Sequence, residues 1–141
     1  MIRIAVLISG RGSNMICLAD AIQANGIAAK ITVVISNKDC AGITLAQGRG
    51  LQTRVIKLQD FDCKADQDNA IAETINDLQV DYIFLAGYMA ILSSNFVDQF
   101  AGKIVNIHPS LLPAFKGLNT HQRAIDENVV THGVSVHVVS A

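Results

Sequence analysis

Short apolar segments alternate with helix-compatible stretches from one end of the chain to the other. Six apolar segments predict strands, at residues 3–9, 30–36, 53–58, 81–86, 103–107 and 134–139. Five stretches between them predict helices, at residues 13–23, 42–47, 64–78, 94–100 and 120–128. Strands of this kind, separated by helices, are typical of a parallel sheet covered on both faces. The sequence therefore predicts an α/β fold with a doubly wound, mostly parallel sheet.

Length and composition fit one domain of this type. The chain has 141 residues, half of them hydrophobic and 16% charged, below the roughly 25% charged residues usual in soluble domains. It contains no linker, repeat or low-complexity segment, so we expect a single domain over residues 1–141. Residues 134–139 alternate valine with serine and histidine, which favours a less buried or edge position for the last strand.

Net charge and cysteine content limit the classes of molecule that the protein is expected to bind. The net charge is −1 and there is no basic cluster, which disfavours nucleic acid and membrane surfaces. Cys17, Cys40 and Cys63 are far apart and lack metal-ligand spacing, so we expect reduced thiols and no metal. The apolar run at residues 4–8 is too short for a membrane span and lacks the features of a signal peptide. We therefore expect a cytoplasmic protein with small-molecule partners.

A glycine loop, Ser-Gly-Arg-Gly-Ser-Asn, follows the first predicted strand at residues 9–14. Its glycines permit a tight turn and a close approach to a ligand, and the N–H groups that open the next helix favour phosphate. Met15 stands where a dinucleotide fingerprint has its third glycine, and no P-loop lysine follows. A phosphomonoester therefore fits best. The alternative is a plain turn in which Ser13 or Asn14 caps the helix. Arg11 is either a phosphate contact or a solvated loop cation, and the second interpretation is favoured.

The predicted strand at residues 103–107 runs into Asn106 and His108. Residues two apart on a strand share a face, so the pair combines a hydrogen-bond donor with a group that titrates near neutrality. Pro109 and Pro113 bracket the short apolar loop that follows. This combination suits acyl transfer, with the amide aimed at a developing oxyanion. The alternative is that both side chains only satisfy loop backbone.

Five motifs give the chain a resemblance to a known family. They are Gly-Arg-Gly-Ser-Asn at residues 10–14, Ala-Gly-Tyr-Met-Ala-Ile-Leu-Ser at 86–93, Asn-Ile-His-Pro-Ser-Leu-Leu-Pro at 106–113, Gly-Leu-Asn-Thr-His at 117–121 and His-Gly-Val-Ser-Val-His at 132–137. In these motifs the chain resembles the folate-dependent phosphoribosylglycinamide formyltransferase family. The resemblance covers essentially the whole chain and implies a formyltransferase-like variant of the Rossmann fold.

The resemblance implies transfer of a formyl group from 10-formyltetrahydrofolate to the amine of glycinamide ribonucleotide, in purine biosynthesis. It implies a monomer or homodimer without a metal. The implied catalytic residues are Asn106 and His108, and Asn106 also contacts the folate. The implied ribose-phosphate site is Gly12, Ser13 and Asn14, and the implied folate site includes Lys64, Met89, Ala90, Ile91 and Leu92. Without the resemblance, residues 88–92 would be interpreted as an ordinary part of the core, although their Met and branched apolar side chains also suit a flat heteroaromatic ring.

The chain departs from the family pattern in places. Ala90 stands where the family commonly has arginine, and Lys64 where arginine is frequent at a position that meets the folate tail. Lysine keeps the charge but loses bidentate geometry. The sequence reaches Ala141 just before the family's Asp-x-Gly motif, whose aspartate tunes the catalytic histidine. We therefore expect a longer enzyme in which the rest of the folate side follows.

Three rival functions remain open on sequence grounds. Formyltetrahydrofolate deformylase shares the pocket but usually has a second histidine where this chain has Pro109. Methionyl-tRNA formyltransferase is disfavoured because the motif at residues 117–121 differs and no basic face is present. A non-catalytic module that binds phosphate or folate is the third candidate.

Overall fold

A six-stranded sheet organises the part of the chain that the computed structural model describes, residues 1–108 and 135–138. The strand order is β3-β2-β1-β4-β5-β6, and all neighbouring pairs are parallel except β5 with β6. The strands are β1 (Ile2–Ile8), β2 (Ala29–Ser36), β3 (Thr53–Val55), β4 (Tyr82–Leu85), β5 (Ile104–His108) and β6 (Ser135–Val138). The prediction of a mostly parallel α/β sheet is confirmed.

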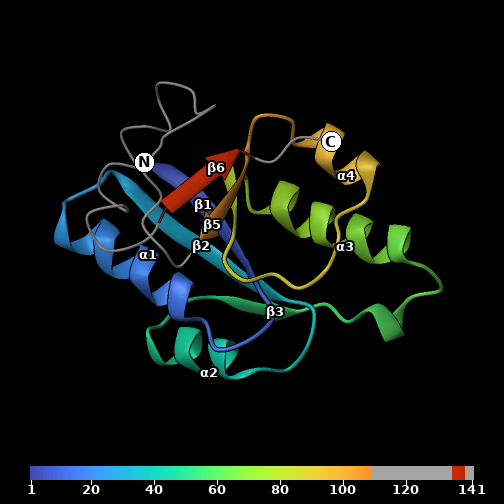
Figure 1. Ribbon diagram of the computed structural model, residues 1–141, viewed down its shortest axis with the longest axis horizontal. Helices are drawn as coiled ribbons and strands as arrows, with labels where there is room; N and C mark the ends of the chain where they lie inside the picture. The colour runs from blue at the N-terminus through green and yellow to red at the C-terminus, as the bar shows by residue number, and fades with distance from the viewer. Residues whose placement is uncertain (109–134, 139–141) are drawn as a thin grey trace.

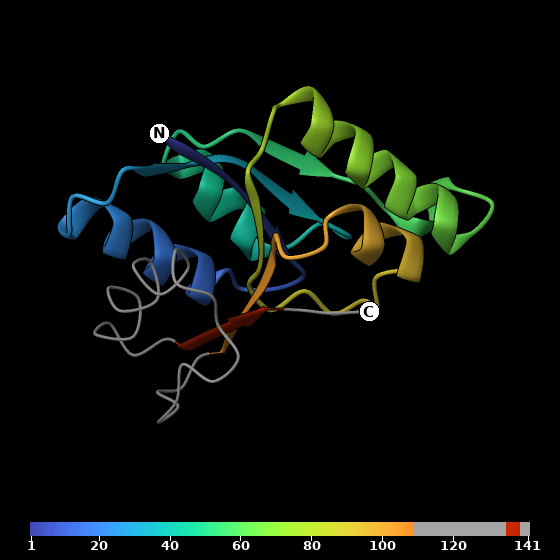
Figure 2. The same ribbon diagram turned by 90° about the horizontal axis from the view of Figure 1, so that it is seen from above.

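Helices cover both faces of the sheet, as Figures 1 and 2 show. They are α1 (Ser13–Ala24), α2 (Ala41–Gly48), the 3₁₀ helix η1 (Leu58–Asp60), α3 (Lys64–Asp77) and α4 (Ser94–Gln99). Helices α1 and α2 pack on one face, and α3 and α4 pack on the other. The doubly wound arrangement follows from this distribution of helices.

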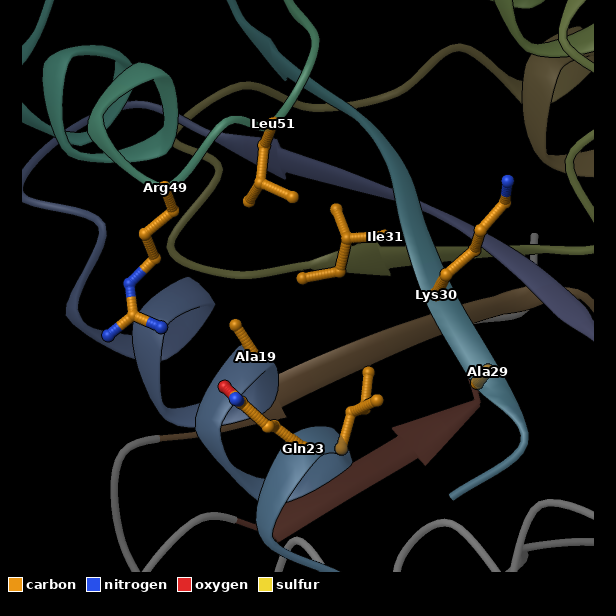
Figure 3. Close-up of a pocket in the computed structure, with 8 residues that line it drawn as sticks. Ala19, Gln23, Ala29, Lys30, Ile31, Arg49 and Leu51 are labelled. Carbon is orange, nitrogen blue, oxygen red and sulfur yellow. The ribbon is translucent and has the colours of Figure 1, made fainter. Parts of the chain in front are cut away.

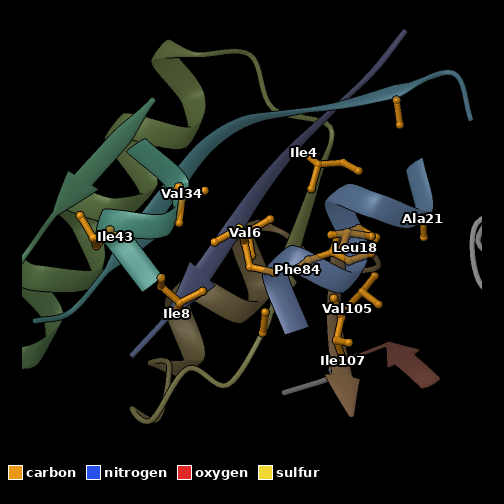
Figure 4. Packing of buried hydrophobic residues seen from close by; sticks show 14 residues of the cluster. Ile4, Val6, Ile8, Leu18, Ala21, Val34, Ile43, Phe84, Val105 and Ile107 are labelled. Atoms are coloured by element: carbon orange, nitrogen blue, oxygen red, sulfur yellow. The ribbon is translucent and has the colours of Figure 1, made fainter. Parts of the chain in front are cut away.

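Strand β1 supplies apolar side chains to both faces, because successive strand residues point in opposite directions. Ile4, Val6 and Ile8 join the core beneath α1 and α2, which Figure 4 shows. Ala5 and Leu7 join the second core, beneath α3 and α4. A strand that is apolar at every position from 4 to 8 therefore belongs in the centre of the sheet.

One end of the sheet differs from the expectation in detail, and the other end agrees with it. The strand predicted at residues 53–58 is too long, since β3 has three residues and η1 follows. Strand β3 pairs only with β2 in the described sheet, so little hydrogen bonding extends it. Strand β6 stands last in the described strand order, which confirms the edge position expected for it. The helix predicted at residues 120–128 lies outside the described residues.

The strand order reverses direction at β1, since β2 lies on one side of it and β4 on the other. In open α/β sheets, ligands bind beyond the carboxyl ends of the strands at such a switch point. The loops that follow β1 and β4 therefore meet where a ligand site is expected. Among residues 1–108 and 135–138, no helix is both long and apolar enough to cross a bilayer.

Candidate functional site at the sheet's switch point

The glycine loop turns from β1 into α1 through Gly12, which has a left-handed φ of 77°. Its carbonyl accepts the N–H of Ile16 at 2.9 Å, which begins the helix. No side chain caps α1, so the alternative that Ser13 or Asn14 caps it is wrong. Within the described residues, the backbone N–H groups of Ser13 and Asn14 have no acceptor. These donors and the helix dipole are available to an anion.

Helix α2 holds this loop in place. The N–H of Gly42 donates to the carbonyl of Gly10 at 2.9 Å. A Cβ added to Gly12 would lie 2.8 Å from the Gly42 Cα, whereas one added to Gly10 would meet nothing within 4 Å. Gly12 is thus required by the fold itself, and the space beside Gly10 is open.

The second loop, residues 86–93, leaves β4 on the other side of the switch point. It exposes large apolar side chains, with Met89 79% and Ile91 88% exposed, while Ala90 and Leu92 are half-buried. Two large apolar side chains exposed two residues apart are typical of a surface to which a ligand or partner binds. A flat heteroaromatic ring is a suitable occupant. Residues 89 and 91 therefore do not belong to the core.

The middle of this loop is anchored beside the glycine loop. The backbone N–H of Met89 donates to the Ser9 hydroxyl at 2.7 Å, and that hydroxyl donates to Oδ1 of Asn37 at 2.7 Å. The C-terminal end is anchored to α3, because the Ser93 N–H donates to Oδ2 of Asp68 at 2.7 Å. Ser93 also caps α4 by accepting the N–H of Phe96.

Lys64 is the first residue of α3, and its ammonium pairs with Oδ1 of Asp68. Asp68 is 1% exposed, while the Lys64 side chain is 33% exposed. Asp68 also acts on Tyr88 in the second loop: burial, and secondarily the Asp68 charge, raise the pKa of Tyr88 to about 12. The contact of Lys64 in the structure is thus with the carboxylate that anchors the loop, and its role toward folate stays a prediction.

Asn106 lies in β5, opposite Leu85 of β4 and His137 of β6 in the strand register. It is half-buried. His108 is the last residue of β5, so the strand extends far enough to include both residues. The side chain of His108 lies outside the described part of the structure.

Sequence reasoning missed the anchors of the second loop, Ser9, Asn37, Asp68 and Ser93. A local signal existed only for Asp68, which follows Lys64 by four residues and so shares its helix face. The bond from Met89 to Ser9 joins residues 80 positions apart, and no local pattern indicates it.

A cavity of about 230 Å³ lies between α1 and the beginning of β2, at the edge of the sheet opposite to the carboxyl ends of the strands (Figure 3). Ile22, Ile31 and Leu51 form much of its lining, and Arg49 pairs with Asp20 at 2.8 Å beside it. It adjoins the beginning of β2, where Ala29 pairs with Ile2. The cavity is therefore remote from the two loops and contains none of the predicted site residues.

The fold and the two loops place the chain in the class of open α/β domains, whose ligand sites lie at the carboxyl edge of the sheet. Comparison with protein families then specifies the family, since the formyl transferase model matches residues 2–141. The chain belongs to the formyl transferase family.

Individual relatives agree with this assignment. The chain is 48% identical over 141 residues to phosphoribosylglycinamide formyltransferase of Haemophilus influenzae, covering 99% of this chain and 66% of the relative. It is 44% identical over 139 residues to the human trifunctional purine biosynthetic protein adenosine-3, covering 98% of this chain and 14% of that protein. The chain thus spans just under two thirds of the bacterial relative and a small part of the human one.

Solved structures match the fold as well. A crystal structure of phosphoribosylglycinamide formyltransferase from Brucella melitensis superposes with a TM-score of 0.78 at 43% identity, covering 99% of this chain and 73% of that one. The glycinamide ribonucleotide transformylase 1 structure from Symbiobacterium toebii gives 0.78 at 35% identity, with coverages of 100% and 67%.

Proposed function

We propose that the protein containing this chain transfers the formyl group of 10-formyltetrahydrofolate to the amine of glycinamide ribonucleotide, as a cytoplasmic enzyme of purine biosynthesis. The observation that carries the proposal is the 48% identity to a bacterial phosphoribosylglycinamide formyltransferase over the chain's whole length. The juxtaposition of an uncapped helix start and an exposed apolar loop at one switch point supports it.

In this proposal the nucleotide's phosphate binds at Gly12, Ser13 and Asn14, where backbone donors lack acceptors among the described residues. The pterin ring covers the loop from Met89 to Leu92, which includes the most exposed apolar side chains near the switch point. These features support the proposed sites for both substrates. The folate contact assigned to Lys64 competes with its bond to Asp68.

The chemistry follows from Asn106 and His108 at the end of β5. The amine nitrogen bonds to the formyl carbon, the bond from that carbon to N10 breaks, and the proton lost by the amine ends on N10. Asn106 donates its carboxamide to the oxygen that becomes negative as the amine adds. His108 moves the proton, since an imidazole titrates near neutral pH.

An assay of the full natural protein with glycinamide ribonucleotide and 10-formyltetrahydrofolate tests the proposal. We expect turnover with both substrates and roughly 10²-fold less with Asn106→Ala or His108→Ala. Release of formate at the same rate without the nucleotide would instead identify a deformylase. Binding of both ligands without turnover would identify a non-catalytic module.

A further inference from the structure

The Ser9 hydroxyl joins three loops that are far apart in the sequence. Ser9 follows β1 directly and is 1% exposed. Its oxygen accepts a hydrogen bond from the Met89 N–H in the loop after β4, and the hydroxyl donates a hydrogen bond to Oδ1 of Asn37 in the loop after β2. Both bonds are 2.7 Å long, and the hydroxyl acts as donor in one and as acceptor in the other.

The bond from the Met89 N–H to the Ser9 hydroxyl holds the middle of the second loop, residues 86–93. Within the described residues, Ala90 and Ile91 make no backbone hydrogen bond outside the loop, and the next anchor is Ser93 on Asp68. Met89 is thus fixed by its backbone although its side chain is exposed. A loop that presents apolar side chains to a ligand needs such a fixed backbone, because a misplacement of about 1 Å costs roughly 10²-fold in rate.

We propose that Ser9 is a positioning residue, which fixes the pterin-binding loop at a set distance from the phosphate-binding loop and thereby sets the affinity for the folate. The inference rests on the proposed function. The glycine loop has its own support, the bond from the Gly42 N–H to the Gly10 carbonyl, so it does not depend on the Ser9 hydroxyl. Loss of that hydroxyl therefore acts on the folate side.

The test compares Ser9→Ala with Ser36→Ala in the full natural protein. Ser36 is a matched control, because it is also fully buried at the end of a parallel strand, and its hydroxyl bonds only locally, to the backbone of Lys38, and contacts Cys40. We expect Ser9→Ala to raise KM for 10-formyltetrahydrofolate about tenfold, the factor for one net hydrogen bond. KM for glycinamide ribonucleotide should change less than about threefold in either variant.

Amide hydrogen exchange provides a second readout that needs no activity. In Ser9→Ala the Met89 amide loses its acceptor and should exchange at least about tenfold faster, while the amides of α1 keep their protection. An unchanged folate KM with unchanged Met89 protection would overturn the role of Ser9. If the KM values for both substrates rose equally in Ser9→Ala and in Ser36→Ala, the effect would be a general structural one. That result would also overturn the role of Ser9.

Failure of the proposed function is distinguishable from failure of this inference. If the unmodified protein transfers no formyl group, the proposed function is wrong, and equilibrium binding of 10-formyltetrahydrofolate to the parent and Ser9→Ala proteins then decides the role of Ser9. Weaker binding with faster Met89 exchange supports it, and equal binding refutes it.

Discussion

At the scale of single residues, the glycine loop contains one glycine that a side chain cannot replace, Gly12, and one beside which there is room for a side chain, Gly10. Gly12 needs its left-handed φ of 77° and its close approach to Gly42. Gly10 lies beside open space. Because any side chain at position 12 disturbs the fold, lost phosphate binding in such a variant would not by itself locate the ligand.

We therefore predict that Gly12→Ala lowers the free energy of unfolding by about 1–3 kcal/mol, from the strained backbone and the contact with Gly42. Gly10→Ala should change it by less than about 0.5 kcal/mol. Urea unfolding monitored by circular dichroism measures both. Equal stabilities for the two variants would contradict the geometry of this loop.

Tyr88 carries a buried hydroxyl that has no hydrogen-bond partner in the described part of the chain. Burial raises its pKa from 10.0 to about 12. The folded protein therefore holds this proton more tightly than the unfolded chain, and its contribution to stability is fully present below pH 10 and is lost as pH rises toward 12.

Tyr88→Phe should accordingly reduce the loss of stability between pH 10 and pH 12, and at neutral pH it should be neutral or stabilising by up to about 1 kcal/mol. Urea unfolding at a series of pH values measures both effects. Tyr82, whose pKa burial also raises, is present in both proteins and cancels in the comparison. An identical pH dependence would show that the hydroxyl is not buried.

At the scale of elements, Asp68 connects α3 to the loop that enters α4. It accepts from the Lys64 ammonium and from the Ser93 N–H while 1% exposed. Two elements are thus joined by one carboxylate, and the loop that we assign to the pterin lies between them.

Asp68→Ala should lower the free energy of unfolding by about 2–3 kcal/mol, because the Ser93 N–H loses its acceptor and Lys64 its counter-ion. Asp20→Ala is the control, since it removes an ion pair whose side chains are 37% and 51% exposed, and it should cost less than about 1 kcal/mol. Denaturant unfolding of both variants tests this. A cost for Asp68→Ala no larger than the control would mean that the link is dispensable.

At the scale of the whole molecule, two helices that both begin Ser-Asn have different surroundings. Helix α1 starts at the switch point after an uncapped Gly12, whereas α4 starts behind Ser93, whose side chain caps it. Only α1 has its first donors beside the reversal of strand order. Binding of a phosphate should therefore be sensitive to a negative charge introduced at Asn14 and insensitive to one introduced at Asn95.

Asn14→Asp and Asn95→Asp form a matched pair. Either aspartate favours its helix dipole, so neither should lower the stability of the ligand-free protein. A nucleotide at 100 times its Kd should stabilise the parent protein and Asn95→Asp by about 2.7 kcal/mol, and Asn14→Asp by much less, because two negative charges then meet. Thermal unfolding with and without glycinamide ribonucleotide measures this. Equal stabilisation of all three proteins would show that the phosphate does not bind at the start of α1.

Much of the fold follows from local sequence pattern. The all-apolar run at residues 4–8 predicts a central strand, and the spacing of strands and helices predicts the α/β class, because both depend on which face of an element is apolar. The positions of the glycine loop after β1 and of Asn106 and His108 at the end of β5 also follow from the sequence, since each is a few adjacent residues at the end of a strand, while their roles stay predictions.

Strand order and the contacts that depend on it were decided by tertiary structure. That β1 lies between β2 and β4, that β6 is antiparallel, and that Ser9 holds the Met89 N–H across 80 positions depend on how whole elements pack. The exposure of Met89 and Ile91 likewise depends on where the loop after β4 lies, so residues that their apolar character alone would assign to the core form a surface instead. Hydrophobic periodicity determines the elements because it is local, while hydrogen bonds between distant loops form only once the sheet has brought those loops together.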